Sequence, residues 1–426
     1  MTNLLGRNLA LLALTLAASL ALAENYVLNN VRIVSPGRPV VERGMIIVSG
    51  DKIAHVGAPT AYESGFNVID CTGLTAYPGF VDAYSRSALR LPDVPAAPEA
   101  PPANDGPLAA MWHENRRGVY ADLDVSKHID PAALAARHNQ GVTTLMLASG
   151  RGAFGGLTCV VAAMQAEPAN VLVARAFQEL SFSGGGGGYP GSAMARIALM
   201  RQMFFDGRYY AANPPQDGDG KDAVIGAIGD AAIGTVRTLF RADSEREIQR
   251  ALNLADEFGL RMTLMGTSGA WQHAAELKQR NIGVVVEAAL PREPNVAPNE
   301  DPVRRLSEAP QEYRDAQHKL WQDNCLAVVK LQAAGVKFAF TSDGDPGSLL
   351  ENVRKHIALG LPADAALRAL TIDAADILGV ADKVGTIEVG KLASLVLMTA
   401  DFTDADTKVK SVFVAGTKFD ITTEEN

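Results

Sequence analysis

The segment Tyr77-Pro78-Gly79-Phe80-Val81-Asp82-Ala83-Tyr84-Ser85-Arg86-Ser87 decides how the rest of the chain is interpreted. A Pro-Gly turn precedes an apolar pair, and small and polar residues follow it, which predicts a β-strand that starts at a turn and ends in polar side chains. Tyr84 and Arg86 lie at the exit of this expected strand.

Strand and helix patterns alternate along the chain after this segment. The expected strands are 142–147, 171–174, 235–240, 262–265, 282–286 and 336–341, and the expected helices are 132–139, 192–205, 244–258, 270–280, 314–334 and 363–378. Short strands that are each followed by a helix predict a parallel sheet with helical crossovers. So many repeats favour an α/β fold closed into a (β/α)8 TIM barrel over an open sheet.

Both ends of the mature chain are rich in short β-patterns. Gly50-Asp51 separates two such patterns and predicts a hairpin, and β-patterns return after Val384. We therefore expect the two ends to form one small β-sandwich lobe beside the barrel. The expected boundaries are 24–76 and 381–426 for the lobe and 77–380 for the barrel, with a Pro-rich loop at 91–107.

The composition is that of a soluble globular protein with an acidic surface. The chain has 426 residues, of which 47% are hydrophobic and 20% charged, and its net charge is −9. Without a basic run, binding to nucleic acid or to an anionic membrane has no electrostatic support. Its cysteines, Cys71, Cys159 and Cys325, are three in number and far apart, so we interpret them as core residues.

The N-terminus resembles a secretory signal peptide. Arg7 supplies the positive charge, 9–22 is apolar, and Ala21-Leu22-Ala23 fits a cleavage site. We expect residues 1–23 to be removed, which leaves an exported protein of the periplasm or cell envelope with no transmembrane segment. The alternative is that this segment is retained as an anchor.

Several motifs in the same order resemble the amidohydrolase superfamily, and its imidazolonepropionase-like branch in particular. The motifs are 77–87, Gly141-Val142-Thr143-Thr144 with Gly155-Gly156, 189–209, 255–277, Thr341-Ser342-Asp343, 358–361, Leu378-Gly379 and 385–393. The resemblance implies a metal site at the mouth of the barrel, with His ligands, a mid-barrel carboxylated Lys or Glu, and an Asp on the last strand.

This chain departs from that ligand set. Tyr84 and Arg86 replace the first two histidines, and Arg241 and Gly266 stand where two more are expected. Near 173–175 we find no Lys for the mid-barrel position. Asp343 alone matches, as the candidate catalytic residue. We therefore predict no metal ligands and no cofactor, with zinc bound only if the family's site is rebuilt in another way.

Two other patterns do not supply the missing chemistry. We expect the histidines in or near predicted helices to be solvated or structural, and His113 follows the Pro-rich loop as a single His. Those near helices are His128, His138, His273, His318 and His356. Five glycines at 184–188 lack the Lys-Ser/Thr of a phosphate-binding loop, so we predict a mobile loop there.

The substitutions themselves indicate what replaces the metal. A buried Asp needs a cationic partner, and a guanidinium pairs with a carboxylate through two hydrogen bonds. We hypothesise that Arg86, Arg241 or both form a salt bridge with Asp343. The alternative is that Arg241 is a surface residue.

Two functions follow from this pattern. The first is a non-catalytic or atypical protein that binds a small-molecule ligand or envelope protein partners, with homo-oligomers also expected. The second is a hydrolase of C–N bonds in cyclic amides or dipeptide-like substrates. Its atypical site would draw on Glu287, Tyr84 or Asp345, because an Asp or Glu can act as a general base.

Overall fold

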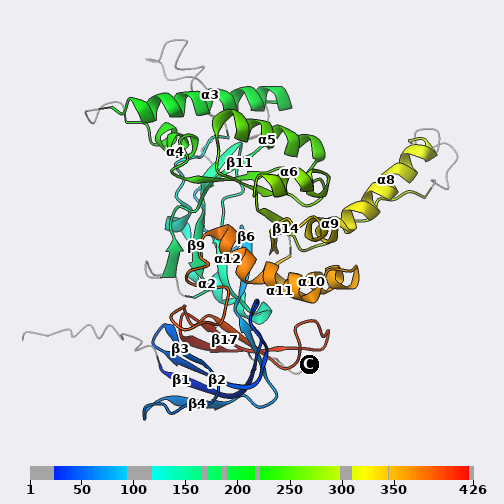
Figure 1. Ribbon diagram of the computed structural model, residues 1–426. Helices are drawn as coiled ribbons and strands as arrows, with labels where there is room; N and C mark the ends of the chain where they lie inside the picture. Colours follow the sequence, from blue (N-terminus) through cyan, green and yellow to red (C-terminus); the bar gives the residue numbers. More distant parts are fainter. Residues whose placement is uncertain are drawn as a thin grey trace, which may run out of the picture.

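The computed structural model describes residues 24–93, 118–164, 170–183, 190–215, 221–297, 309–343 and 345–421. The expected signal peptide, most of the Pro-rich loop, His113 and Gly184 to Gly188 lie outside these residues. Figure 1 shows an α/β part with a lobe of strands below it, and helix α8 extending from the α/β part. Among the described residues, no helix combines the length and the apolar character needed to cross a bilayer.

The lobe brings the two ends of the chain into one sheet. Its strands are β1 (Tyr26–Ile33), β2 (Val41–Ser49), β3 (Lys52–Gly57), β4 (Asn67–Asp70), β5 (Thr75–Pro78), β16 (Leu395–Met398), β17 (Val409–Val414) and β18 (Thr417–Asp420). The order is β18-β17-β16-β5-β1-β2-β3, with β4 paired to β1. Ser49 pairs with Lys52 across Gly50, whose φ is 61°, which confirms the hairpin. The lobe is thus one continuous hydrogen-bonded sheet built from both ends of the chain.

The α/β part contains two further sheets. One has the order β10-β9-β7-β6 and the other β15-β14-β13-β12-β11-β8. Their strands are β6 (Phe80–Ser85), β7 (Val142–Leu147), β8 (Phe154–Leu157), β9 (Cys159–Ala162), β10 (Val171–Val173), β11 (Phe177–Ser181), β12 (Arg237–Arg241), β13 (Met262–Met265), β14 (Val284–Glu287) and β15 (Phe338–Thr341). Strands β11 to β15 are parallel, as is the β6–β7 pair. The fold is therefore α/β, but the described strands do not form one closed hydrogen-bonded barrel.

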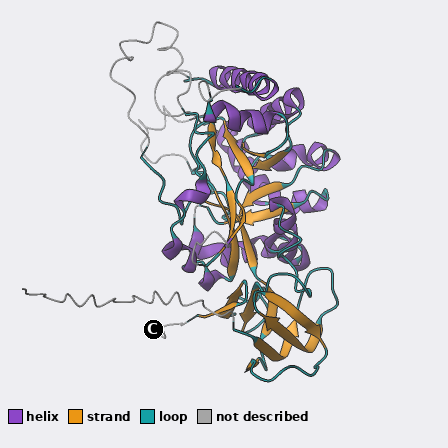
Figure 2. Cartoon of the chain, turned by 90° about the vertical axis from the view of Figure 1, so that its left-hand side faces the viewer, coloured by secondary structure: helices purple, strands orange, loops and turns teal. Residues whose placement is uncertain are grey.

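Helices cover the outside of these strands (Figure 2). They are α2 (Pro131–Ala135), α3 (Ala193–Ala212), α4 (Ala223–Ala232), α5 (Glu245–Phe258), α6 (Ala274–Gln279), α8 (Gln311–Cys325), α9 (Ala327–Ala333), α10 (Leu349–Ala358), α11 (Ala363–Leu370) and α12 (Ile372–Leu378). The capping box of α5, between Ser244 and Glu247, is confirmed. The expected single helices 314–334 and 363–378 are wrong, because the chain breaks at Leu326 and at Thr371.

The expected strand 171–174 is also wrong in its role. Strand β10 is antiparallel to β9, so it belongs to a β-excursion after β7 and is not one of the parallel strands. The sequence pattern did not predict β8, because Gly155 and Gly156 interrupt its apolar residues, and it did not predict β9, a run of only four residues. A Cβ on Gly155 would lie 2.6 Å from a carboxylate oxygen of Glu179, so a side chain there would displace that carboxylate.

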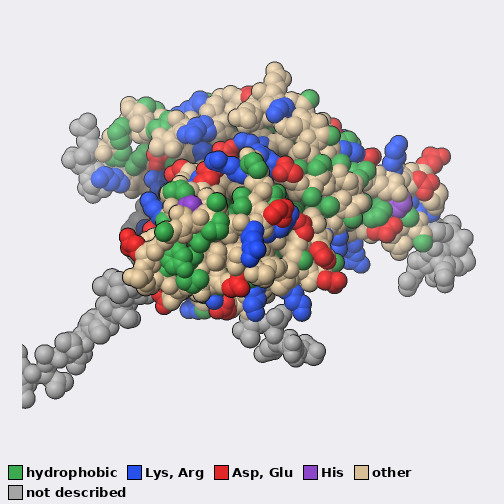
Figure 3. All heavy atoms as spheres, turned by 60° about the horizontal axis from the view of Figure 1, so that its bottom comes forward, with side chains coloured by type: hydrophobic (Ala, Val, Ile, Leu, Met, Phe, Trp, Pro, Cys, Tyr) green, Lys and Arg blue, Asp and Glu red, His purple; other side chains and the backbone are tan. Residues whose placement is uncertain are grey.

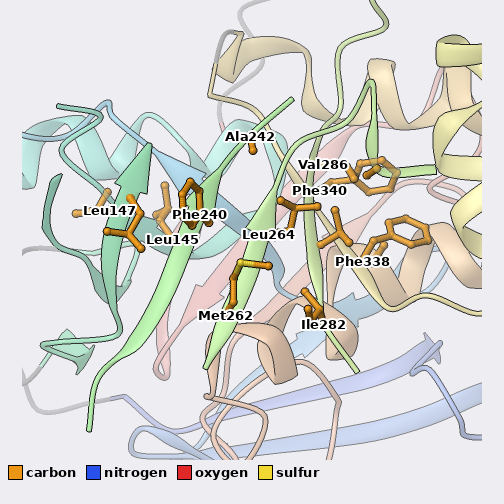
Figure 4. Packing of buried hydrophobic residues seen from close by; sticks show 14 of the residues in the cluster. Leu145, Leu147, Phe240, Ala242, Met262, Leu264, Ile282, Val286, Phe338 and Phe340 are labelled. Carbon is orange, nitrogen blue, oxygen red and sulfur yellow. The ribbon is translucent and has the colours of Figure 1, made fainter. Parts of the chain in front are cut away.

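The parallel strands alternate between two apolar clusters. Phe240, Leu264 and Phe340 point toward the helices, and Figure 4 shows them side by side with their neighbours from adjacent strands. The residues between them form an inner cluster on the opposite face, which includes Phe177, Leu239, Val285 and Ala339. Burial on both faces explains why these strands read as continuous apolar runs.

Helix α12 covers one end of this inner cluster. The guanidinium of Arg237 lies 4.1 Å from the centre of the Phe177 ring and donates to the carbonyls of Ile377 and Leu378 at 2.8 and 2.7 Å. These carbonyls end the helix and lack intrahelical partners, so Arg237 satisfies them. The other end of the inner cluster, at the carboxyl ends of the strands, is left for polar groups.

A buried ion pair connects the two sheets of the α/β part. Asp82 on β6 is fully buried; it pairs with Arg137 and accepts hydrogen bonds from the hydroxyl and, at 3.2 Å, the backbone N–H of Ser342. Ser342 follows β15, so one carboxylate holds the first and last parallel strands together. The Nε and Nη1 atoms of Arg137 have no hydrogen-bond partner among the described residues.

We predict that Asp82→Ala lowers the free energy of unfolding by about 3–5 kcal/mol, because it leaves the buried Arg137 guanidinium unpaired. The matched control is Glu257→Ala, which removes the exposed pair of Glu257 with Arg201 and should cost no more than about 1 kcal/mol. Urea unfolding of both variants measures the difference. Equal losses would show that the Asp82 pair does not hold the sheets together.

Candidate functional site

A polar cavity of about 460 Å³ lies at the carboxyl ends of the parallel strands. The alternation of the inner cluster explains its lining, since one step of two residues beyond Leu239 and Val285 reaches Arg241 and Glu287. The lining residues are Arg86, Ser181, Phe182, Ser183, Arg196, Arg241, Ala242, Asp243, Glu247, Met265, Gly266, Thr267, Val285, Glu287 and Asp343. Tyr84, which we also expected in the pocket, is buried below it.

Arg86 and Asp343 form a two-pronged ion pair in this cavity. The Nε of Arg86 donates to Oδ1 of Asp343 at 2.9 Å, and its Nη2 lies 2.8 Å from Oδ2. The backbone N–H of Arg86 adds a third hydrogen bond to Oδ1 at 3.3 Å. The side chain of Asp343 is 9% exposed and that of Arg86 is 49% exposed. The hypothesised Arg86–Asp343 salt bridge is confirmed, and its hydrogen bond raises the pKa of Arg86.

Space for Arg86 comes from a neighbouring glycine. A Cβ on Gly150 would lie 2.4 Å from Cδ of Arg86, and the backbone φ of Gly150 is +67°, a value that disfavours other residues. The backbone N–H of Gly150 also donates to Glu179 at 2.9 Å. Gly150 therefore leaves space for the Arg86 side chain and donates a hydrogen bond to the Glu179 carboxylate.

Arg241 pairs with a different carboxylate from the one we expected. Its Nη1 lies 3.3 Å from Oε1 of Glu179, whose side chain is 1% exposed. The same oxygen accepts a hydrogen bond from the Tyr84 hydroxyl at 2.8 Å, and the guanidinium of Arg241 lies 5.6 Å from the centre of the Tyr84 ring. Burial, followed by the neighbouring Glu179 charge, raises the pKa of Tyr84 well above its ordinary value, so the hydroxyl remains a donor.

Glu179 is a charged residue of the site that the sequence pattern did not identify. Residues 173–175, where the resemblance led us to expect a mid-barrel Lys, belong to the β-excursion and to the connection into β11. Glu179 lies on β11, two residues beyond Phe177 of the inner cluster, and contacts the residue from each neighbouring ligand position. The signal available in the sequence was an acidic residue placed between the apolar Phe177 and Leu180.

Glu287 lies at the opposite side of the mouth, at the end of β14. Its side chain is exposed, and no ion pair joins it to another described residue. Burial of part of the carboxyl, followed by the charges of Asp343 and Asp243, raises the pKa of Glu287. Arg86 opposes this effect but does not cancel it. Asp345, the other acidic candidate, does not line the cavity.

Gly266 is present for steric reasons. A Cβ at this position would lie 1.9 Å from the carbonyl oxygen of Ala242, so the backbones of two adjacent strand ends approach too closely for any side chain. The structure therefore leaves no room for a ligand side chain at a position where the resemblance implies a His.

The residues at the mouth do not fit a divalent metal. Within the described parts of the chain, no group of three or more His, Cys, Asp or Glu side chains is arranged to hold one. Glu179 and Asp343 are already bonded to guanidinium groups, and a dication between them would face Arg86 and Arg241. His138 and His356 lie elsewhere, where each bonds a backbone carbonyl.

Comparisons with known proteins agree with this architecture. Residues 239–418 match the amidohydrolase family. An imidazolonepropionase from Sphingopyxis alaskensis is 25% identical over 388 residues, which cover 84% of this chain and 87% of that protein. An amidohydrolase from Thermotoga maritima superposes with a TM-score of 0.73 at 20% identity, covering 93% of this chain and 100% of that one. A prolidase solved with N-methylphosphonate-L-proline gives a TM-score of 0.55 at 19% identity, covering 93% and 99%.

Arg86→Ala should lower the free energy of unfolding by about 1–2 kcal/mol, because it removes both guanidinium contacts from a mostly buried carboxylate and leaves only the backbone N–H of residue 86 as donor. The expected loss is smaller than for Asp82→Ala, because about half of the Arg86 side chain is exposed to solvent. Arg38→Ala, which breaks a single-contact pair on the lobe, is the control. Thermal or urea unfolding that finds the two variants equal would contradict a structural role for the Arg86 pair.

Glu287→Gln should stabilise the protein at neutral pH by less than about 1 kcal/mol, because a raised pKa means that folding disfavours the ionised form. The gain should vanish below about pH 4, where the carboxyl is protonated in the folded and unfolded chains alike. Urea unfolding at a series of pH values tests this, with the exposed Glu63→Gln as control. A gain that persists in acid would rule out this explanation.

Proposed function

We propose that this protein works without a metal and binds a small polar molecule, because it is similar to the amidohydrolase family over residues 239–418 and carries arginines where that resemblance implies two metal ligands. The observation that supports this best is the two-pronged Arg86–Asp343 pair. It occupies the single family-matched carboxylate with a permanent cation.

The charge balance supports the same proposal. A bound dication would offset the cost of burying Glu179 and Asp343. Here Arg241 and Arg86 do so, and the Tyr84 hydroxyl donates an additional hydrogen bond. Guanidinium groups hold carboxylates in place but do not generate a hydroxide nucleophile as a metal does. The site is therefore suited to binding, and a strong hydrolytic activity is not expected from it.

An atypical hydrolase of C–N bonds is the second candidate. Glu287 favours it, because a carboxyl with a raised pKa at the mouth of a cavity is suited to general acid–base catalysis. Arg86 lines the same cavity and would stabilise an oxyanion. General acid–base help of this kind contributes about 10²–10⁴-fold. The related imidazolonepropionase and the prolidase neighbour are the reason to test cyclic amides and dipeptides as substrates.

We further propose that the protein acts outside the cytoplasm, after removal of residues 1–23. This rests on the sequence pattern of that segment, since it lies outside the described residues. N-terminal sequencing of protein recovered from the periplasmic fraction should start at Glu24. A chain that retains Met1 would point to an anchor. We also propose that the exported protein binds partner proteins of the envelope or forms homo-oligomers.

Metal analysis separates the proposed function from ordinary metal-dependent catalysis. Protein purified from zinc-supplemented medium should contain no stoichiometric zinc, and excess zinc should not raise its melting temperature, because the mouth already holds two guanidinium groups. One tightly bound equivalent would overturn the proposal. Hydrolysis of cyclic amides and dipeptides in the presence of a chelator, with Glu287→Gln and Asp343→Asn as comparisons, then tests the second candidate.

A further inference from the structure

We propose that the cavity recognises a zwitterion, with Arg196 and Arg241 binding the carboxylate of the ligand and Glu287 binding its amine. This rests on the proposed function, since it names the class of small polar molecule. It assigns a specificity role to Arg196, which the family's ligand positions do not include.

Most charged groups that line the cavity already have partners in the protein. Asp343 holds Arg86. Asp243 accepts backbone hydrogen bonds from Thr267 and Ser268 at 2.8 and 2.9 Å. These carboxylates therefore complete the walls of the cavity.

Glu247 belongs to the same group. It takes part in the capping box at the start of α5, where its side chain accepts from the backbone N–H of Ser244. Its charge also complements the positive end of that helix. Glu247 is thus used in holding the helix terminus.

Arg196, by contrast, has hydrogen-bond donors that face the cavity and pair with no carboxylate of the described residues. It lies on the first turns of α3, lines the cavity and is half-buried, and its Nε donates to the carbonyl of Pro190 at 3.3 Å. No carboxylate pairs with it among the described residues. The carbonyl fixes the orientation of the guanidinium while its two terminal nitrogens remain available for a ligand oxygen.

Arg241 adds donors from the neighbouring strand end. Its contact with Glu179 uses one terminal nitrogen at 3.3 Å, and a quarter of its side chain is exposed in the cavity. Arg196 and Arg241 thus offer fixed guanidinium donors from two elements. A carboxylate is the group that accepts from both in a bidentate manner.

Glu287 supplies the carboxylate that would accept hydrogen bonds from the ligand amine. Glu287 is the last residue of β14. Strand β13 separates β14 from β12, which carries Arg241, and Glu179 lies on the next strand, β11, where it contacts Arg241. Met265 and Val285 line the cavity from the strands between these groups. A ligand amine at Glu287 would supply the partner that this carboxylate lacks, and it would also relieve the effects that raise the pKa of Glu287.

The size of the cavity agrees with such a ligand. About 460 Å³ is within the range of small-molecule sites and exceeds the needs of a single inorganic ion. Met265 and Val285, which line the cavity from the strands between the two charged ends, would contact the uncharged middle of the molecule.

Calorimetry with three related probes tests the proposal on metal-free full-length protein. The probes are the dipeptide Ala-Ala, its C-terminal amide and its N-acetyl derivative, with amine release monitored in parallel. Wild type should prefer Ala-Ala to either derivative by about tenfold to a hundredfold, which corresponds to one charge-assisted hydrogen-bond pair. Arg196→Ala should abolish the preference over the amide, and Glu287→Gln the preference over the N-acetyl form.

The control is Arg201→Ala, on the same helix but paired to Glu257 and outside the cavity, and it should bind all probes as wild type does. Preference over the amide that survives in Arg196→Ala overturns the role of Arg196. Equal binding of all three probes, or of none, to wild type overturns the zwitterion proposal. Either result leaves the proposed metal-free function to be tested by the zinc measurement, which does not depend on any of the three probes.

Discussion

The pairing of arginines with aspartates where β6 meets β15 is the interaction on which the rest of the structure depends. The two strands belong to different hydrogen-bonded sheets, so no continuous ladder joins them. Two carboxylates bridge them instead: Asp82 on β6 accepts hydrogen bonds from Ser342 after β15 while pairing with Arg137, and Asp343 after β15 pairs with Arg86 after β6. Because unpaired buried charges are costly, each pair fixes the relative position of the strands as well as satisfying its own members. The junction between β6 and β15 therefore stabilises the fold and also positions residues of the cavity.

The changes at the mouth form a coupled set. Arg86 requires the space beside Gly150, and Gly150 in turn donates its N–H to Glu179. Glu179 then binds Arg241 and Tyr84. Replacing Tyr84, Arg86 or Arg241 by His would remove one of the donors that hold the carboxylates of Glu179 and Asp343.

The sequence predicted those features that depend on local pattern. Strand β7 (Val142–Leu147) matches its apolar run residue for residue, and the Arg86–Asp343 pair followed from two substitutions considered together. Glu179 was missed because its strand is only five residues long and its register depends on packing against β12, which no local pattern encodes. The break at Leu326 was also missed, because helical propensity continues across it.

A site built from fixed charges imposes a different kind of selectivity from one built around a metal. A metal with open coordination positions accepts many oxygen and nitrogen ligands, and its specificity comes from the surrounding walls. Arg196, Arg241 and Glu287 instead present donors and an acceptor at set positions on α3, β12 and β14. A ligand lacking either charge leaves one of these groups desolvated without a partner, which penalises binding more than a missing apolar contact would.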